Sequence, residues 1–145
     1  LMAKAAAAGD PGVFAAPTAD RKQVELAAMD AVMAAERELG NNPEDVSAQK
    51  VGYDILSFDP DTRQHRFIEV KGRADGADTV TVTRNEIITA LNKPDDFILA
   101  IVSVENGFAH EPRYLKQPFA IEPSFDTVHV TYALQELLAR STAPA

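Results

Sequence analysis

An almost uninterrupted apolar segment, residues 97–104, places the strongest constraint on how this chain folds. Its sequence, FILAIVSV, is apolar on both sides of an extended backbone. Such a strand lies in the middle of a sheet whose two faces are both covered. The segment is also far too short to span a membrane as a helix. We therefore expect a central buried strand with other elements packed on either face of its sheet.

A long helix is predicted ahead of this strand, over residues 20–39. Asp20 and Gln23 have the spacing of a capping box, which satisfies free N–H groups of the first turn. The sequence GNNP at 40–43 ends the helix. The apolar residues that recur at helical spacing are Val24, Ala27, Ala28, Ala31, Val32, Ala35 and Leu39.

Two strands are predicted next, over residues 51–58 and 65–71. The sequence DPDT at 59–62 is typical of a turn, and so short a connection predicts an antiparallel hairpin. Gly72 is expected to stop the second strand. A polar connection, residues 43–50, joins the first helix to this hairpin.

A third strand, residues 79–83, is short, β-branched and alternating. Thr83 and Glu86 have capping-box spacing and open a second helix that closes before Pro94. About a dozen residues containing this helix separate residues 79–83 from residues 97–104. We therefore expect these two strands to be parallel neighbours, joined by a right-handed crossover.

The remainder is less regular. Residues 108–119 form a strand or a loop, residues 128–130 a short strand, and residues 132–139 a terminal helix. The expected fold class is α/β, more narrowly an α+β mixed sheet flanked by helices, in the order helix, three strands, helix, strand.

A single domain over residues 20–140 fits the length of 145 residues. Residues 1–19 are rich in alanine and broken by glycine and proline, so we expect a flexible linker or an artificial leader. The start at Leu1, with Met2 behind it, indicates a fragment of a longer protein. Residues 141–145 are expected to be a tail.

Several classes of protein are excluded by what the sequence lacks. It has no cysteine, and hence no disulfide, thiolate zinc site or cysteine nucleophile. His65, His110 and His129 have no metal-ligand spacing, and Ser57 and Ser103 lack the pattern of a serine hydrolase. No glycine-rich nucleotide-binding loop occurs. With 14 basic and 22 acidic residues, the net charge of −8 disfavours a self-sufficient nucleic-acid binder.

The hairpin carries the residues most suited to chemistry. Glu69 and Lys71 are two apart on one strand and leave the same face, whereas Ile68 and Val70 leave the other. Asp54 lies near the start of the first strand, where hairpin pairing could bring it beside Glu69. Two close carboxylates repel unless a cation lies between them, and such oxygen ligands suit Mg²⁺.

The same spacing also fits a solvated strand face with a cross-strand ion pair worth under about 1 kcal/mol. Asp54 and Glu69 both stand among apolar neighbours, where an unpaired carboxylate is costly, and this favours a site. A lysine beside it could favour a bound hydroxide or offset charge on a phosphate.

Three segments, GYDI at 52–55, FIEVKG at 67–72 and TRNE at 83–86, are similar to the NO VEIN carboxy-terminal domain family. The order of elements resembles the PD-(D/E)XK nuclease superfamily, with Tyr53 in place of the proline for which it is named. The resemblance covers about residues 24–119. Members of the family are often appended to large helicase-like or restriction-related bacterial proteins.

This resemblance implies roles by position. Asp54 and Glu69 would bind Mg²⁺ or Mn²⁺, with the main-chain carbonyl of Val70 as a third ligand. Lys71 would orient or activate the attacking water. Glu25 would be either an additional acidic residue of the site or a solvated helix position.

Four residues are weaker candidates for contact with nucleic acid. Arg66, Arg73 and Arg84 could form, with Lys71, a basic edge that meets phosphates, and Arg84 or Asn85 could reach the rim of the site. The alternatives are scattered surface charge and, for Asn85, an ordinary position early in a helix.

The resemblance thus implies a Mg²⁺-dependent DNA nuclease module of a helicase-like or restriction and defence protein. Because the chain is acidic, DNA would be held with other domains or by a homodimer. A non-catalytic interaction or DNA-sensing module is the alternative. We expect a cytoplasmic protein with no membrane partner.

Overall fold

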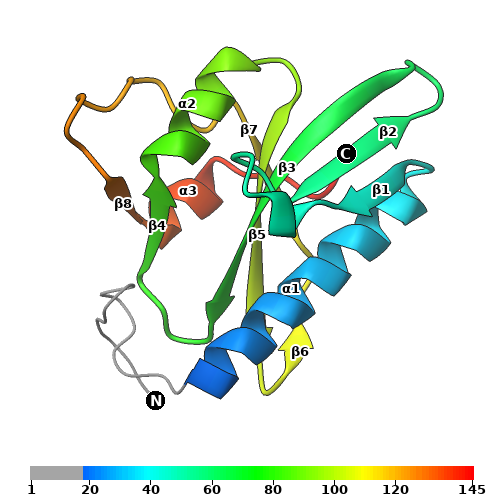
Figure 1. Cartoon of the computed structure of the whole chain (residues 1–145). Coiled ribbons are helices and arrows are strands. Elements are labelled where there is room, and N and C mark those ends of the chain that lie inside the picture. Colours follow the sequence, from blue (N-terminus) through cyan, green and yellow to red (C-terminus); the bar gives the residue numbers. More distant parts are fainter. Residues whose placement is uncertain (1–17) are drawn as a thin grey trace.

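The computed structural model describes residues 18–145, and the centre of its main sheet is the strand β5 (Figure 1). The six strands of this sheet in the described part are β1 (Asn42–Asp45), β2 (Ile55–Asp59), β3 (Gln64–Ala74), β5 (Phe97–Glu105), β6 (Phe108–Ala109) and β7 (Arg113–Lys116). β5 pairs in parallel with β3 and antiparallel with β6 and β7, while β3 continues through β2 to β1. A short 3-10 helix, Ser47–Gln49, follows β1.

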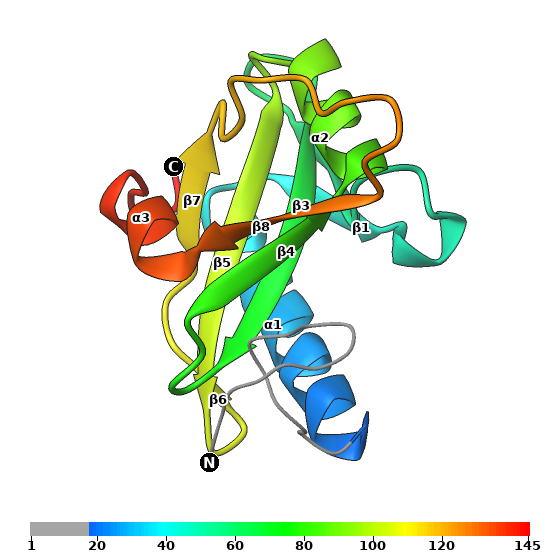
Figure 2. The same ribbon diagram turned by 90° about the vertical axis from the view of Figure 1, so that its left-hand side faces the viewer.

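Two layers cover the sheet from opposite sides (Figure 1). One is the helix α1 (Thr18–Glu38), which packs on β3, β5 and β1. The other combines a two-stranded ribbon, β4 (Thr79–Thr83) with β8 (His129–Ala133), and the helices α2 (Arg84–Asn92) and α3 (Leu134–Ala139). Figure 2 shows this ribbon crossing in front of β3 and β5.

The two faces of β5 confirm the prediction of a strand buried on both sides. Phe97, Leu99 and Ile101 pack with α2, α3 and the ribbon, whereas Ile98 and Ala100 pack beneath α1. The chain is therefore a mixed α+β fold with an apolar core on each side of its sheet. None of the helices in residues 18–145 is long and apolar enough to cross a membrane.

The helix α1 lies very close to the sheet at Gly72. A Cβ atom there would lie 2.8 Å from the Cβ of Ala28 and 3.0 Å from the main-chain oxygen of Val24. The missing side chain lets the helix lie directly on β3. The prediction that Gly72 stops its strand is wrong, since β3 runs on to Ala74 and Gly72 is a packing position inside it.

The predicted partner of β4 is also wrong. β4 was expected beside β5, but it pairs antiparallel with β8, and the parallel neighbour of β5 is β3. Val80 and Val82 point from the ribbon into the core shared with α2 and α3. A short alternating strand buries one face in this way whether it lies in the main sheet or across it, so its pattern does not reveal its partner.

The limits of several elements also differ from those expected. β8 covers His129–Ala133 where a strand over residues 128–130 was expected, and α3 begins at Leu134 instead of residue 132. α1 begins at Thr18, so Asp20 lies in its first turn and does not cap it. The polar connection after α1 contains the edge strand β1, whose charged sequence NPED hides it from a search for apolar alternation. β2 begins only at Ile55, which leaves residues 51–54 as a loop. The proposed leader falls largely on residues 1–17, outside the described residues.

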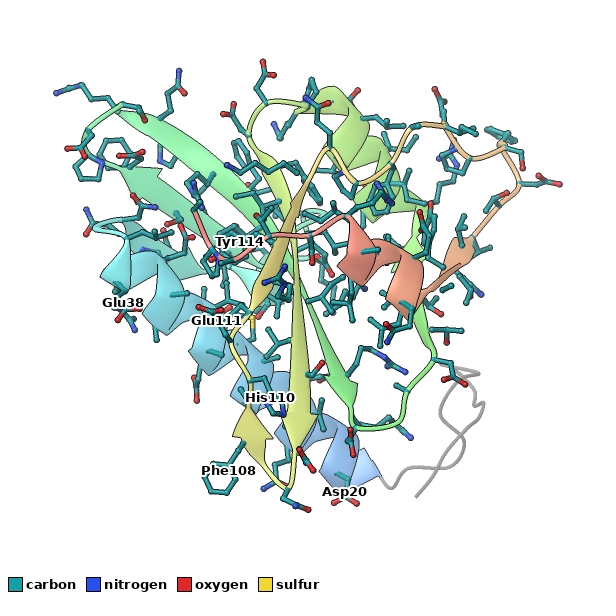
Figure 3. All side chains as sticks on the ribbon, turned by 180° about the vertical axis from the view of Figure 1, so that it is seen from behind. Asp20, Glu38, Phe108, His110, Glu111 and Tyr114 are labelled. Atoms are coloured by element: carbon teal, nitrogen blue, oxygen red, sulfur yellow. The ribbon has the colours of Figure 1, made fainter. Side chains whose placement is uncertain are left out.

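One buried charged group fastens α1 to the far edge of the sheet. The carboxylate of Glu36 is fully buried and accepts hydrogen bonds from Asn41 Nδ2 at 3.1 Å, Arg66 Nε at 3.1 Å, Arg66 Nη2 at 3.0 Å and Tyr114 Oη at 2.7 Å. Tyr114 lies on β7 beside α1 (Figure 3). Arg66 also donates to the main-chain oxygen of Ala145 at 3.0 Å. We call the side chains of Glu36, Asn41, Arg66 and Tyr114 the Glu36 cluster.

Candidate functional site

Asp54 is the last residue before β2, and its main chain and side chain extend the pairing with β3 beyond the first residue of that strand. Its N–H donates to the oxygen of Ile68 at 2.8 Å, and its Oδ2 accepts from the N–H of Val70 at 3.0 Å. The register of the hairpin, with Ile55 opposite Ile68, sets Asp54 beside Glu69. The hairpin therefore brings the two carboxylate residues together.

Glu69 and Lys71 extend from β3 on the face turned away from α1, as their spacing predicts. Ile68 and Val70 pack beneath α1 on the opposite face. Glu69 is 4% exposed, and its Oε2 lies 3.2 Å from Nζ of Lys71. This is a nearly buried ion pair at the middle of the sheet.

Glu86 is the member of the site that the sequence did not suggest. Its role as a helix cap is confirmed, because Thr83 N–H donates to Glu86 Oε1 at 2.9 Å and Glu86 N–H donates to Thr83 Oγ1 at 3.1 Å. The same Oε1 also lies 3.1 Å from Nζ of Lys71. We call Asp54, Glu69, Lys71 and Glu86 the Glu69 cluster. In the sequence, the only sign of Glu86 was the TRNE segment, and helix capping alone is enough to explain the spacing of that segment.

The loop before β2 is packed against α2. Gly52 has φ of +95°, and a Cβ atom there would overlap the side chain of Thr89 and lie 3.4 Å from Nδ2 of Asn85. Tyr53 meets the ring of Phe67 edge to face, with centroids 5.1 Å apart. The three segments that carry the sequence resemblance therefore come together, and their contacts fix α2, and with it Glu86, over β3.

The charges of the Glu69 cluster do not balance, since three carboxylates surround one ammonium group. Burial raises the pKa of Glu69 well above its ordinary value; Lys71 opposes this rise, and the nearby carboxylates of Glu86 and Asp54 add to it. Burial also raises the pKa of Asp54, against the opposing effects of the Val70 N–H and Lys71. Burial thus favours the protonated forms of Glu69 and Asp54, and a cation bound beside them would favour the ionised forms.

Lys71 and Glu86 respond in the opposite sense. Burial would lower the pKa of Lys71, but the adjacent carboxylates of Glu69 and Glu86 raise it. Burial would raise the pKa of Glu86, but Lys71 and the Thr83 N–H lower it. Lys71 is thus held as a cation between two carboxylates, with Glu86 its ionised partner.

This cluster opens to solvent through two adjoining hollows of about 470 and 280 Å³. Both are lined by Ser47, Asp54 and Glu69. The larger extends between α1 and β4, and the smaller extends toward the beginning of α2. Further lining residues of the larger hollow are Lys22, Glu25, Asp30, Asp45, Val70, Lys71 and Arg73, and those of the smaller are Lys50, Gly52, Asn85 and Glu86.

The donors available to a cation are two carboxylates and a carbonyl. Alternate residues of a strand direct both N–H and C=O to the same neighbour, so the Val70 carbonyl faces the edge where its N–H meets Asp54. Within residues 18–145, no three His, Cys, Asp or Glu side chains form a metal-binding group. Two carboxylates, a carbonyl and water are nonetheless a donor set that Mg²⁺ accepts.

The weaker candidates divide into two groups. Glu25, which is exposed on α1, and Arg73 line the larger hollow, and Asn85 lines the smaller one. Arg66 does not reach either hollow, because it is bound within the Glu36 cluster. Arg84 turns the other way, toward Phe125. The basic edge expected from these arginines is therefore not assembled.

The three segments that meet at the two hollows lie within the part of the chain that matches a known family. The profile of the family described as Protein NO VEIN, C-terminal, matches residues 24–115. The chain belongs to this family. No curated protein and no solved structure matches the chain.

Proposed function

We propose that this domain is a metal-dependent nuclease module of the PD-(D/E)XK type that hydrolyses phosphodiester bonds of DNA. The observation that supports it best is the Glu69 cluster, in which Asp54, Glu69 and Lys71 line the larger hollow and three carboxyl groups adjoin one lysine. Lys71 is already paired with Glu69 and Glu86, so these ion pairs do not require Asp54 beside Glu69. A bound divalent cation would favour the ionised form of Asp54 and Glu69.

Asp54, Glu69 and the Val70 carbonyl would hold Mg²⁺ or Mn²⁺. When bound, the metal would supply positive charge that stabilises the scissile phosphate as negative charge builds on it. Glu25, on the α1 side of the larger hollow, would contribute through water. The narrow space between α1 and β4 would limit the orientations in which a phosphodiester reaches these groups.

Lys71 would act on the attacking water. Its ammonium group would donate a hydrogen bond that orients the water, and its charge would favour hydroxide and offset the phosphate. Glu86 is a positioning residue in this scheme, because its Oε1 would keep Lys71 in place while Glu69 turns to the metal. The capping box in turn fixes that oxygen at the first turn of α2.

The affinity for DNA would come largely from elsewhere. The net charge of −8 repels phosphates. Of the four residues predicted to form a basic edge, only Lys71 and Arg73 line the larger hollow. We infer that the domain works within a larger helicase-like or restriction and defence protein, or as a homodimer, that holds the DNA against it.

A non-catalytic interaction or DNA-sensing module is the second candidate, and one observation favours it. Lys71 is already held by two carboxylates at 3.1 and 3.2 Å, so the ion pairs are complete without a ligand. A domain that kept the fold and lost catalysis would retain such contacts for stability.

Cleavage of plasmid and single-stranded DNA with Mg²⁺ or Mn²⁺ tests the proposal. Asp54→Ala and Lys71→Ala should each abolish cutting. Glu38→Ala and Arg37→Ala are matched controls, because these exposed residues of α1 line neither hollow. Both controls should cut like the unaltered chain.

If nothing is cut, calorimetric titration of metal on the same samples decides between the candidates. Binding that disappears in Asp54→Ala would support a competent site that needs its parent protein. The absence of binding would leave the Glu69 cluster as structural charges, and the interaction module would be the better description.

A further inference from the structure

The loop between β7 and β8, residues 117–128, exposes large apolar side chains. Ile121 is 80% exposed, Phe125 92% and Val128 75%. Exposing three such residues within eight positions is costly for a water-soluble surface and usually marks a place of contact. Figure 2 shows the loop passing beside α2.

A network of short hydrogen bonds holds the tip of the loop in a defined turn. The Oγ of Ser124 lies 3.0 Å from Oδ1 of Asp126 and 2.6 Å from Oγ1 of Thr127, and Thr127 N–H donates to the Ser124 oxygen at 3.0 Å. Phe125 follows Ser124 in the sequence of this turn. Its ring is thus presented to solvent by an organised backbone, which lowers the entropy lost when something binds it.

Arg84 connects the loop to the candidate site. Its N–H donates to the Val128 oxygen at 2.8 Å, its Nε donates to the Ser124 oxygen at 3.4 Å, and its guanidinium lies 5.9 Å from the centroid of the Phe125 ring. The next two residues, Asn85 and Glu86, line the smaller hollow. The ring and the hollow are therefore attached to the same first turn of α2.

The charge of the loop limits what can bind there. Glu122 and Asp126 are acidic, as is the chain as a whole, so the surface does not attract phosphates. An aromatic ring beside a guanidinium binds instead the flat faces of nucleobases, and it does so with little dependence on sequence. This contact requires bases that are unpaired.

We propose that Phe125 and Arg84 form a stacking platform for unpaired bases of the DNA strand that enters the site. The proposal rests on the proposed function, and it narrows the substrate to DNA with single-stranded or frayed segments. Because stacking and not phosphate contact supplies the affinity, binding by this platform should not weaken as the salt concentration rises, since salt screens the repulsion between the acidic chain and the strand.

Fluorescence tests the platform separately from catalysis. The chain contains no tryptophan, so Phe125→Trp introduces a single tryptophan at the platform, which is excited selectively at wavelengths that the three tyrosines do not absorb. Phe108→Trp is the matched control, because Phe108 is the first residue of β6, is 78% exposed, and lies at the opposite end of the molecule (Figure 3). Single-stranded oligothymidine is titrated onto each variant in EDTA, so that no strand is cut.

We expect oligothymidine to quench the tryptophan fluorescence of the Phe125→Trp variant and to leave that of the Phe108→Trp variant unchanged. Phe125→Ala should weaken binding of the same strand roughly tenfold, within the range found for loss of a base–aromatic stack. Each of these substitutions replaces an exposed side chain, so the thermal unfolding midpoint should not move.

The platform and the nuclease can fail separately. Quenching in the Phe125→Trp variant, without cleavage under any metal condition, would support the platform and count against the nuclease. Cleavage by the unaltered chain, with no quenching in that variant, would overturn the platform and leave the nuclease. An emission shift that follows protein concentration and ignores DNA would identify a protein contact and would also overturn the platform.

Discussion

The two buried charged clusters of this domain have similar components and opposite electrostatics. Glu36 is fully buried, and four hydrogen bonds from neutral and cationic donors surround it. Although burial would raise its pKa, Tyr114 and Arg66 hold the pKa of Glu36 below its ordinary value. Glu69 is almost as buried, yet its pKa is raised well above the ordinary value because burial and other carboxylates outweigh Lys71.

The Glu36 cluster stabilises the fold, whereas the Glu69 cluster contains a carboxylate that destabilises it. Ionised Glu36 lowers the free energy of the folded state, whereas ionised Glu69 raises it. The Glu36 cluster fastens α1 to the sheet edge, and the Glu69 cluster lines the hollows. Buried groups whose pKa is shifted against ionisation are typical of sites that bind or react, since folding alone would not favour them.

The largest effect expected is on the Glu36 cluster. Glu36→Ala should lower the free energy of unfolding by about 3–5 kcal/mol, because it leaves Arg66 and the Tyr114 hydroxyl without their buried acceptor. Urea denaturation measures this. Glu38→Ala, on the exposed face of the same helix, is the control and should change stability by less than about 0.5 kcal/mol.

The pH dependence of the unaltered chain and Glu36→Ala sharpens the test. The pKa of Glu36 is lowered in the folded state, so its contribution is present above pH 4.5 and is lost as pH falls through the folded-state pKa. The unaltered chain should therefore approach the stability of Glu36→Ala in acid. A constant difference down to low pH would contradict the assignment.

Gly52→Ala should have the next largest effect and should lower the free energy of unfolding by about 3 kcal/mol. A side chain there meets an unfavourable positive φ and overlaps Thr89, so both strain and displacement of α2 contribute. Gly76→Ala is the control, since Gly76 has φ of +89° with no atom within 4 Å of its Cβ position, and it should cost roughly 1 kcal/mol. Denaturant titration compares the two variants, and equal losses would mean that Gly52 does not hold α2 in place.

The smallest expected effect is an increase in stability. Glu69→Gln should raise the free energy of unfolding at pH 7 by about 1 kcal/mol, because a neutral side chain avoids the burial of an unfavourable charge. The folded-state pKa is raised, so the gain should be near zero at pH 4.5 and grow as pH rises through that pKa. Thermal melts across this interval measure it.

Glu86→Gln provides the contrast within the same cluster. The pKa of Glu86 is lowered, so removal of its charge should destabilise the domain at neutral pH, although glutamine still completes the cap. If Glu69→Gln also destabilised the domain, the two clusters would not differ in the way described above.

Local patterns predicted much of the fold. The long helix, the hairpin, the capped helix α2 and the strand covered on both faces each follow from periodicity or capping within one segment. The partner of β4 did not follow, because β8 lies some fifty residues away and pairing at that distance leaves no local signal. The register that brings Asp54 beside Glu69 could be predicted because a short turn sets it.

The fourth member of the site could not be predicted from spacing. Glu86 has a sufficient local explanation as a cap, and only the packing of Gly52 against α2 turns the same oxygen toward Lys71. For Arg66 and Arg84 the error is the opposite one, since the sequence suggested a binding role and the structure uses both side chains elsewhere. Both are plausible phosphate ligands by charge, but Glu36 binds one and the 117–128 loop binds the other.

The pairing of β4 with β8 also sets an order in which the domain can assemble during synthesis. The β2–β3 hairpin can close as soon as residue 74 is free of the ribosome, whereas β4 has no partner until residue 133 follows it. Until then, the main-chain hydrogen-bonding groups of β4 form an unpaired edge that is prone to aggregate. A chain that stopped at residue 115, where the family profile ends, would keep that edge permanently.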